Sequence, residues 1–457
     1  MTINRSNPGD VEMTVSVYRD GKRLETSDGK YELKEYVKGL ELFESITSST
    51  LEARMIIDDA GGLLGIMSGS EVFKITLKGS VADRTYHMRS YSINSRSRVN
   101  QDSDVYIIDL ASDEFIKNEA VNLFGKTDIV FNKQIESSAI IRKVLKDDKR
   151  FLSSKKNLYL EETITNHSFV MPNWRAFDVI YWLSERSIRK SQKGNTLQNG
   201  FAFFENALGY HFKSIDKLIE DINLQTTEKT NTNTGKVKLH HYELSAKNMD
   251  DGVKDQFRIT SVVFPEEKNF LMGLRHGAWS GFSIGFDPVT ISQSKMGLNS
   301  TDLSVDAYKY SLSTLWSKMN HLDGPGKTNP MTKMDKGIQN LINYPKRVRY
   351  TIMPNQIFDE NKDNPQKNYE QLVELQAYQW MRIESLKTTK LKITIPGNLD
   401  LYAGYGIHVT IPSTVKSGSK PKADKKYTGR YLIASLTHSV VNGTLTTELL
   451  LMKDSTY

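Results

Sequence analysis

Apolar and polar residues alternate through two long segments, one near each end of the chain. In Ile46–Ser112 the alternation is clear at Leu51, Ala53 and Met55, and it returns throughout Leu386–Asp454. A period of two residues is typical of β-strands with one buried face. Each segment is therefore predicted to form a compact antiparallel β unit.

The two segments also resemble each other, as two diverged copies of one repeat would. A true repeat of this length would define the architecture of the chain. However, many strand-rich segments can be aligned by their alternation alone once gaps are allowed. We favour a duplicated β-barrel over chance. The correspondence pairs Ser49, Leu51, Ala53 and Met55 with Thr389, Leu391, Ile393 and Ile395; Gly69 and Val72 with Gly404 and Ile407; Tyr86, Arg89 and Tyr91 with Tyr427, Arg430 and Leu432; and Ile108 and Leu110 with Leu449 and Leu451.

Helical spacing appears only between these segments. A helix is expected from Ser137 or Ser138, a second after Pro172 and Asn173, and the clearest over Tyr369–Ser385. The aromatic stretch Phe201–Ile219 is predicted to be a hairpin followed by a capped helical turn, with its rings filling a core. The middle of the chain is therefore predicted to be mixed α/β.

These patterns predict a β-rich α+β multidomain protein with two duplicated antiparallel β-barrels, a mixed α/β domain and an inserted domain. Near the start, a strand over Glu12–Tyr18 is expected to turn at Asp20-Gly21. The expected domains are a first barrel at 1–117, a mixed α/β domain at 118–215, a second barrel split between 216–262 and 386–457, and an inserted α/β region at 263–385 that ends in a helix.

Composition narrows the chemistry. The chain has 457 residues, 15 Met and no Cys, which excludes disulfides, thiolate zinc sites and cysteine catalysis. No stretch approaches the roughly 20 apolar residues of a membrane span, so we expect a soluble protein made in the cytoplasm without a membrane anchor.

The net charge of +7 is concentrated in two basic segments, Arg142–Lys156 and Lys416–Arg430. Only Phe151 offers an aromatic ring for base stacking in the first, so nucleic-acid binding is not expected as the main function. The first segment is expected to be a solvated helix face or loop, and Lys416–Lys426 a flexible loop between strands.

Catalytic patterns are weak. Gly281–Gly285 has the spacing of a nucleophile elbow around Ser283, and Asp302 and His321 follow in a suitable chain order. However, Phe286 and the residues after it do not start a helix, so the glycines are expected to serve β-bulges or close packing.

Phosphate, metal and glycosidase patterns are weaker still. Gly326-Lys327-Thr328 lacks the first glycine of a phosphate-binding loop, and adjacent His240 and His241 would face opposite sides of a strand. Acidic pairs such as Asp58-Asp59 suit turns between strands. We predict no catalytic, cofactor or metal residues.

Three parts of the chain carry a resemblance to one protein family. They are Leu399–Ile407 with Tyr427–Ile433 and His438; Gln376, Gln379 and Trp380; and Phe203–Asn206 with Tyr210–Asp216. The first resembles the closing barrel of central baseplate hub proteins of contractile-tailed, myovirus-type phages, and the second resembles the entry into that barrel. The third resembles a hub motif of large myoviruses, and the hub portion of type VI secretion spikes is related.

The resemblance implies a structural protein rather than an enzyme, without a cofactor. It implies a homotrimeric ring with near-sixfold symmetry, located in the virion baseplate after assembly in the host cytoplasm. The implied partners are a trimeric central spike or needle, the tail tube protein, baseplate wedge proteins and, transiently, phage DNA. The alternatives that stay open are a hub with peptidoglycan-degrading activity, and a spike component of a type VI-like injection machine or another polysaccharide-binding module.

Overall fold

The computed structural model describes most of the chain. It covers residues 7–454 apart from 27–28, 30, 126–133, 148–150, 192–196, 247–253, 266–270, 272–273, 276–278, 288–291, 294–308, 325–328, 344–347, 353–364, 388 and 418–419. Among the described residues, no helix is both long and apolar enough to cross a membrane.

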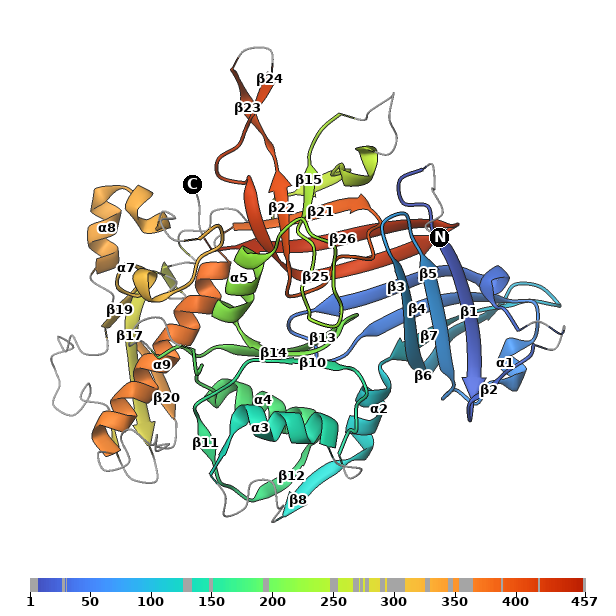
Figure 1. The fold of residues 1–457 in the computed structure, drawn as a ribbon, viewed down its shortest axis with the longest axis horizontal. Coiled ribbons are helices and arrows are strands. Elements are labelled where there is room, and N and C mark those ends of the chain that lie inside the picture. The colour runs from blue at the N-terminus through green and yellow to red at the C-terminus, as the bar shows by residue number, and fades with distance from the viewer. Residues whose placement is uncertain are drawn as a thin grey trace.

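One large sheet of 13 strands runs through the molecule and contains strands from both ends of the chain (Figure 1). Its order is β16 (Ser261–Val263), β21 (Thr389–Pro396), β26 (Thr444–Lys453), β25 (Gly429–Val441), β3 (Val37–Ser45), β4 (Glu52–Asp59), β7 (Asp104–Ala111), β6 (Asp83–Arg98), β5 (Val72–Lys78), β1 (Glu12–Arg19) and β2 (Lys22–Arg23). Off this path, β22 (Gly406–Thr410) pairs with β25 and carries β15 (His240–Glu243).

The sheet consists of two halves with the same strand order. In the first half β3, β4, β7, β6 and β5 are neighbours, and in the second half β16, β21, β26, β25 and β22 occupy the corresponding places, all with antiparallel pairing. In each half the last three strands in chain order form a meander, and the strand before them returns to lie beside the last, which is the Greek-key arrangement. The outermost strands differ, because β1 is antiparallel to β5 whereas β15 is parallel to β22.

A β-bulge occupies the same place in both halves. In β6 the register shifts around Tyr91, next to the pairing of Ser90 with Leu110. In β25 it shifts around Ala434, next to the pairing of Ile433 with Leu451. Bulges are specific features that re-aim a strand, so their coincidence is independent support for a repeat.

The correspondence expected from the sequence is wrong in detail. Arg89 corresponds to Leu432 and not to Arg430, and Val72 corresponds to Gly406 and not to Ile407. The first strand is also displaced. With Leu110 matched to Leu451, Ala53 corresponds to Leu391 and not to Ile393, because these two residues lie opposite Leu110 and Leu451. A shift of two residues leaves every side chain on the same face, so alternation alone cannot detect it.

The path of described strands does not close. It runs from β16 at one end to β2 at the other, so the described strands form two equivalent halves of an open sheet rather than the two closed barrels expected. The Asp20-Gly21 turn between β1 and β2 forms as predicted, with positive φ at both residues.

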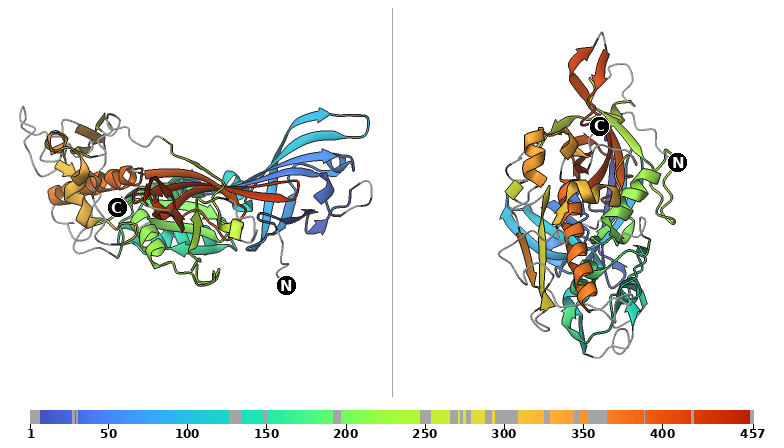
Figure 2. Two further views of the ribbon diagram at one scale, coloured as in Figure 1. Left: turned by 90° about the horizontal axis from the view of Figure 1, so that it is seen from above. Right: turned by 90° about the vertical axis from the view of Figure 1, so that its left-hand side faces the viewer.

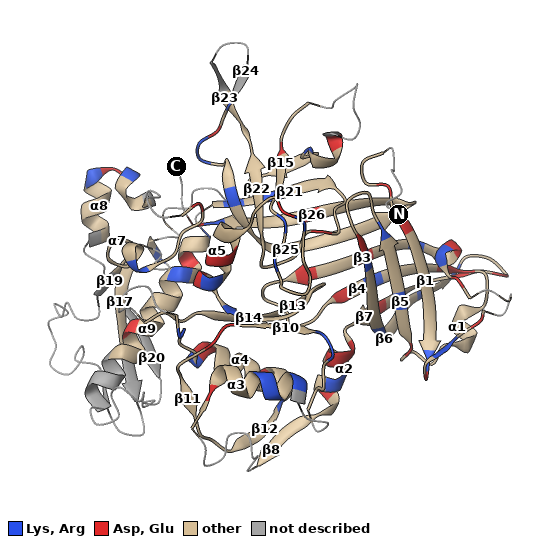
Figure 3. Ribbon diagram, in the orientation of Figure 1, with Lys and Arg blue, Asp and Glu red and all other residues tan. Residues whose placement is uncertain are grey.

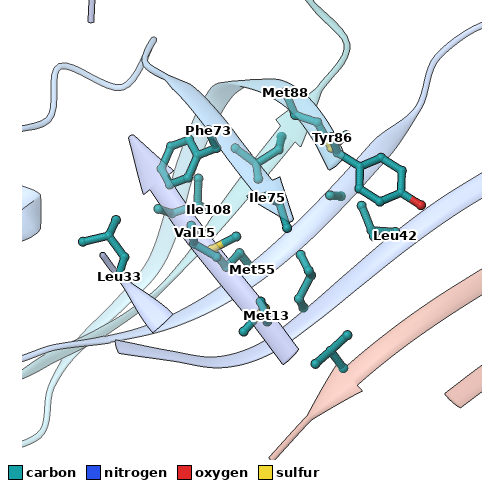
Figure 4. Packing of buried hydrophobic residues seen from close by; sticks show 14 of the residues in the cluster. Met13, Val15, Leu33, Leu42, Met55, Phe73, Ile75, Tyr86, Met88 and Ile108 are labelled. Carbon is teal, nitrogen blue, oxygen red and sulfur yellow. The ribbon is translucent and has the colours of Figure 1, made fainter. Parts of the chain in front are cut away.

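Each half has its own apolar core. In the first half, inward-facing side chains of β1 and β3 to β7 meet in one cluster, including Phe73, Met55 and Ile108 (Figure 4). Leu399, Val440 and Leu445 of the second half extend this cluster across the boundary, which ties the two halves together by burial as well as by backbone pairing.

The middle of the chain packs below the sheet in Figure 1 as a mixed α/β layer. Its strands β10, β14 and β13 form a small sheet, and the rings of Phe203, Tyr210 and Phe212 fill the core between this sheet and α4. The helix expected near Ser137 forms, but the prediction that Ser137 or Ser138 caps it is wrong. The helix begins at Ser137, its N-cap residue is Glu136, and no side chain makes a capping hydrogen bond. The elements are α2 (Asp113–Ala120), β8 (Asn122–Gly125), β9 (Ile135–Glu136), α3 (Ser137–Arg142), β10 (Asn157–Leu160), β11 (Asn166–His167), β12 (Met171–Arg175), α4 (Ala176–Arg186), β13 (Phe201–Asn206), β14 (Gly209–Ser214) and α5 (Ile215–Leu224).

The hairpin and capped helix predicted for Phe201–Ile219 are confirmed, because Ser214 Oγ accepts a hydrogen bond from the Lys217 N–H at the start of α5. The helix predicted over Tyr369–Ser385 is also confirmed. It is α9 (Pro365–Leu386), which contacts β17 (Ser280–Asp287) and α7 (Leu312–Leu315). The same region contains β18 (Ser292–Gln293), β19 (Lys309–Ser311), α8 (Lys336–Asn343) and β20 (Val348–Ile352).

Gly209 shows how closely the hairpin approaches β10. Its φ is 138°, and a Cβ atom there would lie 2.3 Å from the Asn157 carbonyl oxygen. Gly21 also has positive φ, but a Cβ atom there would meet no other atom within 4 Å. Gly209→Ala should therefore destabilise the protein by about 3 kcal/mol and Gly21→Ala by only about 1 kcal/mol. Thermal unfolding of the two variants tests this, and equal losses would contradict the close approach.

Candidate functional site

The seam between the two halves is the pairing of β25 with β3. Seven residue pairs join them, from Ser435 opposite Ser45 to Val441 opposite Gly39. Leu40 and Val440 lie opposite each other and are both buried. Residues from the two ends of the chain thus form one continuous ladder.

Glu44 lies at the seam and is buried. One carboxyl oxygen accepts a hydrogen bond from the Ala207 N–H at 2.8 Å, and the other accepts one from the Ala403 N–H at 3.0 Å. This single side chain therefore binds the turn of the β13–β14 hairpin and a loop of the second half. Burial raises the pKa of Glu44 to about 7, although the two N–H groups act in the opposite direction.

A second carboxyl group, Glu205 on β13, joins the middle layer to the first half. It accepts hydrogen bonds from the Leu51 N–H at 3.1 Å and from Ser112 Oγ at 2.6 Å. Lys156 Nζ lies 2.5 Å from Glu205 and 2.6 Å from Glu114. Burial raises the pKa of Glu205, which the Lys156 charge partly opposes. Burial lowers the pKa of Lys156, but the two carboxylates outweigh it and the net shift is upward.

The sequence did not predict this network. Lys156 was expected to be solvated with the rest of its basic segment, but it is mostly buried between two carboxylates. The available signal was Glu205 itself, a charged residue directly after Phe203 and Phe204 in a stretch expected to be core. Such a residue is rarely buried without a partner of opposite charge.

A third buried network fixes α9 to the second half. The Arg382 guanidinium lies 3.2 Å from Asp454 and 3.5 Å from Asp216, and His321 Nδ1 lies 2.9 Å from Asp454. Tyr378 donates a hydrogen bond to Asp216 at 2.8 Å. Burial raises the pKa of Asp454, but the His321 hydrogen bond and the Arg382 charge lower it overall. Figure 3 shows acidic and basic positions meeting where α5 and the upper end of α9 lie side by side.

The catalytic pattern around Ser283 does not assemble among the described residues. Gly281 and Ser283 lie inside β17, paired with β19 and β20, so no strand-to-helix elbow exposes the serine. Both ring nitrogens of His321 already have partners, Asp454 and the Trp316 carbonyl. Asp302 and Gly326-Lys327-Thr328 lie outside the described residues.

Within the described part of the chain, no three His, Cys, Asp or Glu side chains gather as a metal site. His240 and His241 point to separate partners, Asp400 at 2.9 Å and Thr410 at 2.7 Å, as their adjacent strand positions predicted. Asp59 accepts hydrogen bonds from Leu63 and Leu64 in the turn after β4, the structural role expected of the Asp58-Asp59 pair.

The second basic segment forms a hairpin, β23 (Pro412–Ser417) and β24 (Lys420–Ala423), which projects at the top of Figure 1. It lies between β22 and β25, where the first half has only the short turn from Lys78 to Asp83. Arg430 at its end is not part of the projecting loop. Its guanidinium donates to the Ile222 and Asn223 carbonyls at 2.7 and 2.8 Å, at the C-terminal end of α5.

The fold is similar to those of phage tail proteins and of a chain from a PdpA–VgrG complex. The tail protein from Neisseria meningitidis MC58 matches 97% of this chain and 97% of its own at 9% identity and a TM-score of 0.49. The 43 kDa tail protein of prophage MuSo2 from Shewanella oneidensis matches 98% of this chain and 100% of its own at 9% identity and a TM-score of 0.48. A chain of the Francisella PdpA–VgrG complex matches 98% of this chain at 12% identity and a TM-score of 0.48, and this chain spans 53% of it.

These matches extend over nearly the whole of this chain, and they are to proteins of the class that the sequence motifs resemble. No protein-family model matches the sequence, and no curated protein does.

The raised pKa of the buried Glu44 predicts that the stability of the folded protein depends on pH. The unfolded chain releases the Glu44 proton near its ordinary pKa of 4.5, whereas the folded protein keeps it until about pH 7. The folded state therefore binds more protons in this window, and the contribution of Glu44 to stability falls as the pH rises through it. Glu44→Gln should gain stability relative to the wild type between pH 5 and pH 8, measured by thermal unfolding. Glu41→Gln, on the exposed face of β3, is the matched control, and a pH-independent difference for Glu44→Gln would contradict the assignment.

Lys156 provides a second test. Lys156→Met leaves Glu114 and Glu205 without their cation and should destabilise the protein by about 3 kcal/mol. Adding Glu205→Gln should recover part of this loss, because one unpaired charge is removed. Lys74→Met, at an exposed position of β5, should change stability by less than about 0.5 kcal/mol. A loss at Lys156 no larger than at Lys74 would show that the network is not coupled to folding.

Proposed function

We propose that this chain is a structural, non-enzymatic subunit of a contractile-tail baseplate hub. Three copies form a ring with near-sixfold symmetry, which joins a trimeric central spike to the hexameric tail tube and lets the genome pass. The observation that carries the proposal is the repeat, the same strand order and the same bulge in both halves of the sheet. The sequence motifs that resemble hub proteins support it independently.

The repeat suits a ring between partners of different symmetry. Three chains with two equivalent halves each present six similar surfaces to a sixfold partner while keeping true threefold symmetry. The seam between β3 and β25 fixes the angle between the halves, and the Glu44 carboxyl group holds it on both sides.

The differences between the halves suit the threefold partner. The β23–β24 hairpin occurs only in the second half, and the outermost strands also differ, since β1 is antiparallel to β5 whereas β15 is parallel to β22. In a ring each would appear three times. A trimeric spike can bind features that occur three times around the ring. Such features do not repeat six times, so a sixfold partner does not use them.

Under this proposal, the domains at 1–117 and at 216–262 with 386–457 provide the two ring-forming halves. The domain at 118–215 and the insertion at 263–385 brace them from outside. The protein belongs in the tail baseplate of the virion, with the spike, the tube and the wedge proteins as its neighbours.

The molar mass of the purified protein tests the ring. Size-exclusion chromatography with light scattering should give about 156 kDa, three times the 52.0 kDa chain. Dilution of the sample shows whether the trimer persists. A chain that stays at 52.0 kDa at every concentration, and also with a spike protein added, would overturn the trimeric ring.

A further inference from the structure

The distal part of β6 has an open edge. Ser92–Arg98 pairs with β7 on one side, and no strand in the described part of the chain pairs with it on the other. Its counterpart in the second half, Ser435–Val441 of β25, is paired on both sides, with β26 and with β3. In the second half, the partner of this edge is therefore β3, across the seam.

The counterpart of β3 in the second half is β16. As β3 pairs antiparallel with the outer edge of β4, so β16 pairs antiparallel with the outer edge of β21. The other edge of β16 has no partner strand among the described residues. Val263 and Phe264 are 52% and 37% exposed beside it. Among the described residues, each chain therefore has two unpaired strand edges. The distal part of β6 corresponds to the β25 side of the seam, and β16 corresponds to the β3 side.

We infer that β16 of one copy of this chain pairs antiparallel with the distal part of β6 of the next copy, which repeats the internal seam between subunits. This inference rests on the proposed ring and adds the two strand edges that close it. Open edges of this kind otherwise promote uncontrolled association.

The geometry of the contact agrees with a closed ring. The contact is heterologous, because β6 and β16 are different surfaces, and such contacts form rings when the rotation closes. The β6–β7 hairpin extends beyond the rest of the sheet in the left-hand view of Figure 2, so its edge is accessible to another subunit. Repetition of the internal seam would place eight strands from each chain in one continuous ring, from β16 through β25 and β3 to β6.

The seam also predicts the register of the contact. Glu41 lies opposite Ser439 in the seam, and the pairing of β16 with β21 makes Val263 the counterpart of Glu41. Two residues of β6 could be the counterpart of Ser439, because β6 has a second register shift after Asn94. Counting residues along β6 gives Arg96, whereas following the pairing of β6 with β7 gives Ser97. Neighbouring strand residues face opposite sides, so only one of these two can share a face with Val263.

Cysteine cross-linking tests this register directly, because the chain has no Cys of its own. Two variants are needed, Ser97→Cys with Val263→Cys and Arg96→Cys with Val263→Cys. After mild oxidation, one of them should run as covalent dimers and trimers on a denaturing gel, and the other should not. A reducing agent should return both to the monomer.

The internal seam provides the matched control. Glu41→Cys with Ser439→Cys joins the same two positions within one chain, so it should form a disulfide without raising the mass of the denatured chain. Cross-linking of one β6 variant supports the edge pairing. A trimer by light scattering with neither variant cross-linked would overturn the edge pairing and leave the ring standing. A monomer with neither variant cross-linked would overturn both.

Discussion

The backbone pairing of β25 with β3 is the interaction on which the rest of the fold depends. It converts two separate Greek-key halves into one sheet and sets their relative orientation through a ladder of seven residue pairs. Glu44 can reach both the Ala207 and the Ala403 amides only because the seam brings these segments together. The apolar contact of Leu40 with Val440 excludes water from the same place, which strengthens the hydrogen bonds beside it.

Two buried charged networks and the Glu44 carboxyl group lie around this sheet, and each joins segments that are far apart in the sequence. The ion pairs contribute little to the net free energy of unfolding, because the cost of removing a charge from water nearly equals its attraction to its partner. Their main effect is on how the layers are arranged. Glu205 accepts hydrogen bonds from two segments of the first half, and Arg382 requires carboxylates from α5 and from the end of β26. A wrong arrangement of the layers would leave these charges unpaired, so the networks favour a single arrangement.

Local elements were predictable from the sequence, whereas their partners were not. The Asp20-Gly21 turn, the hairpin before Ser214 and the α9 helix follow from local chemistry and periodicity, and all three form. The two-residue error in matching Ala53 left every side chain on its expected face, so the alternation held no information about it. The open sheet, the pairing of β25 with β3 and the burial of Lys156 depend on contacts across most of the chain. Alternation and charge runs do not encode such contacts, although Glu205 among phenylalanines indicated that a buried cation was needed.

The seam has a consequence for the timing of folding. Gly39 pairs with Val441, so the ladder joins segments near the two ends of the described chain. A ribosome releases the N-terminal strands long before β25 is made, and contacts of such long sequence separation form slowly. The edge of β3 must therefore stay unpaired until β25 has been made. A chain that stops before β25 cannot complete the seam, so it cannot acquire the native sheet.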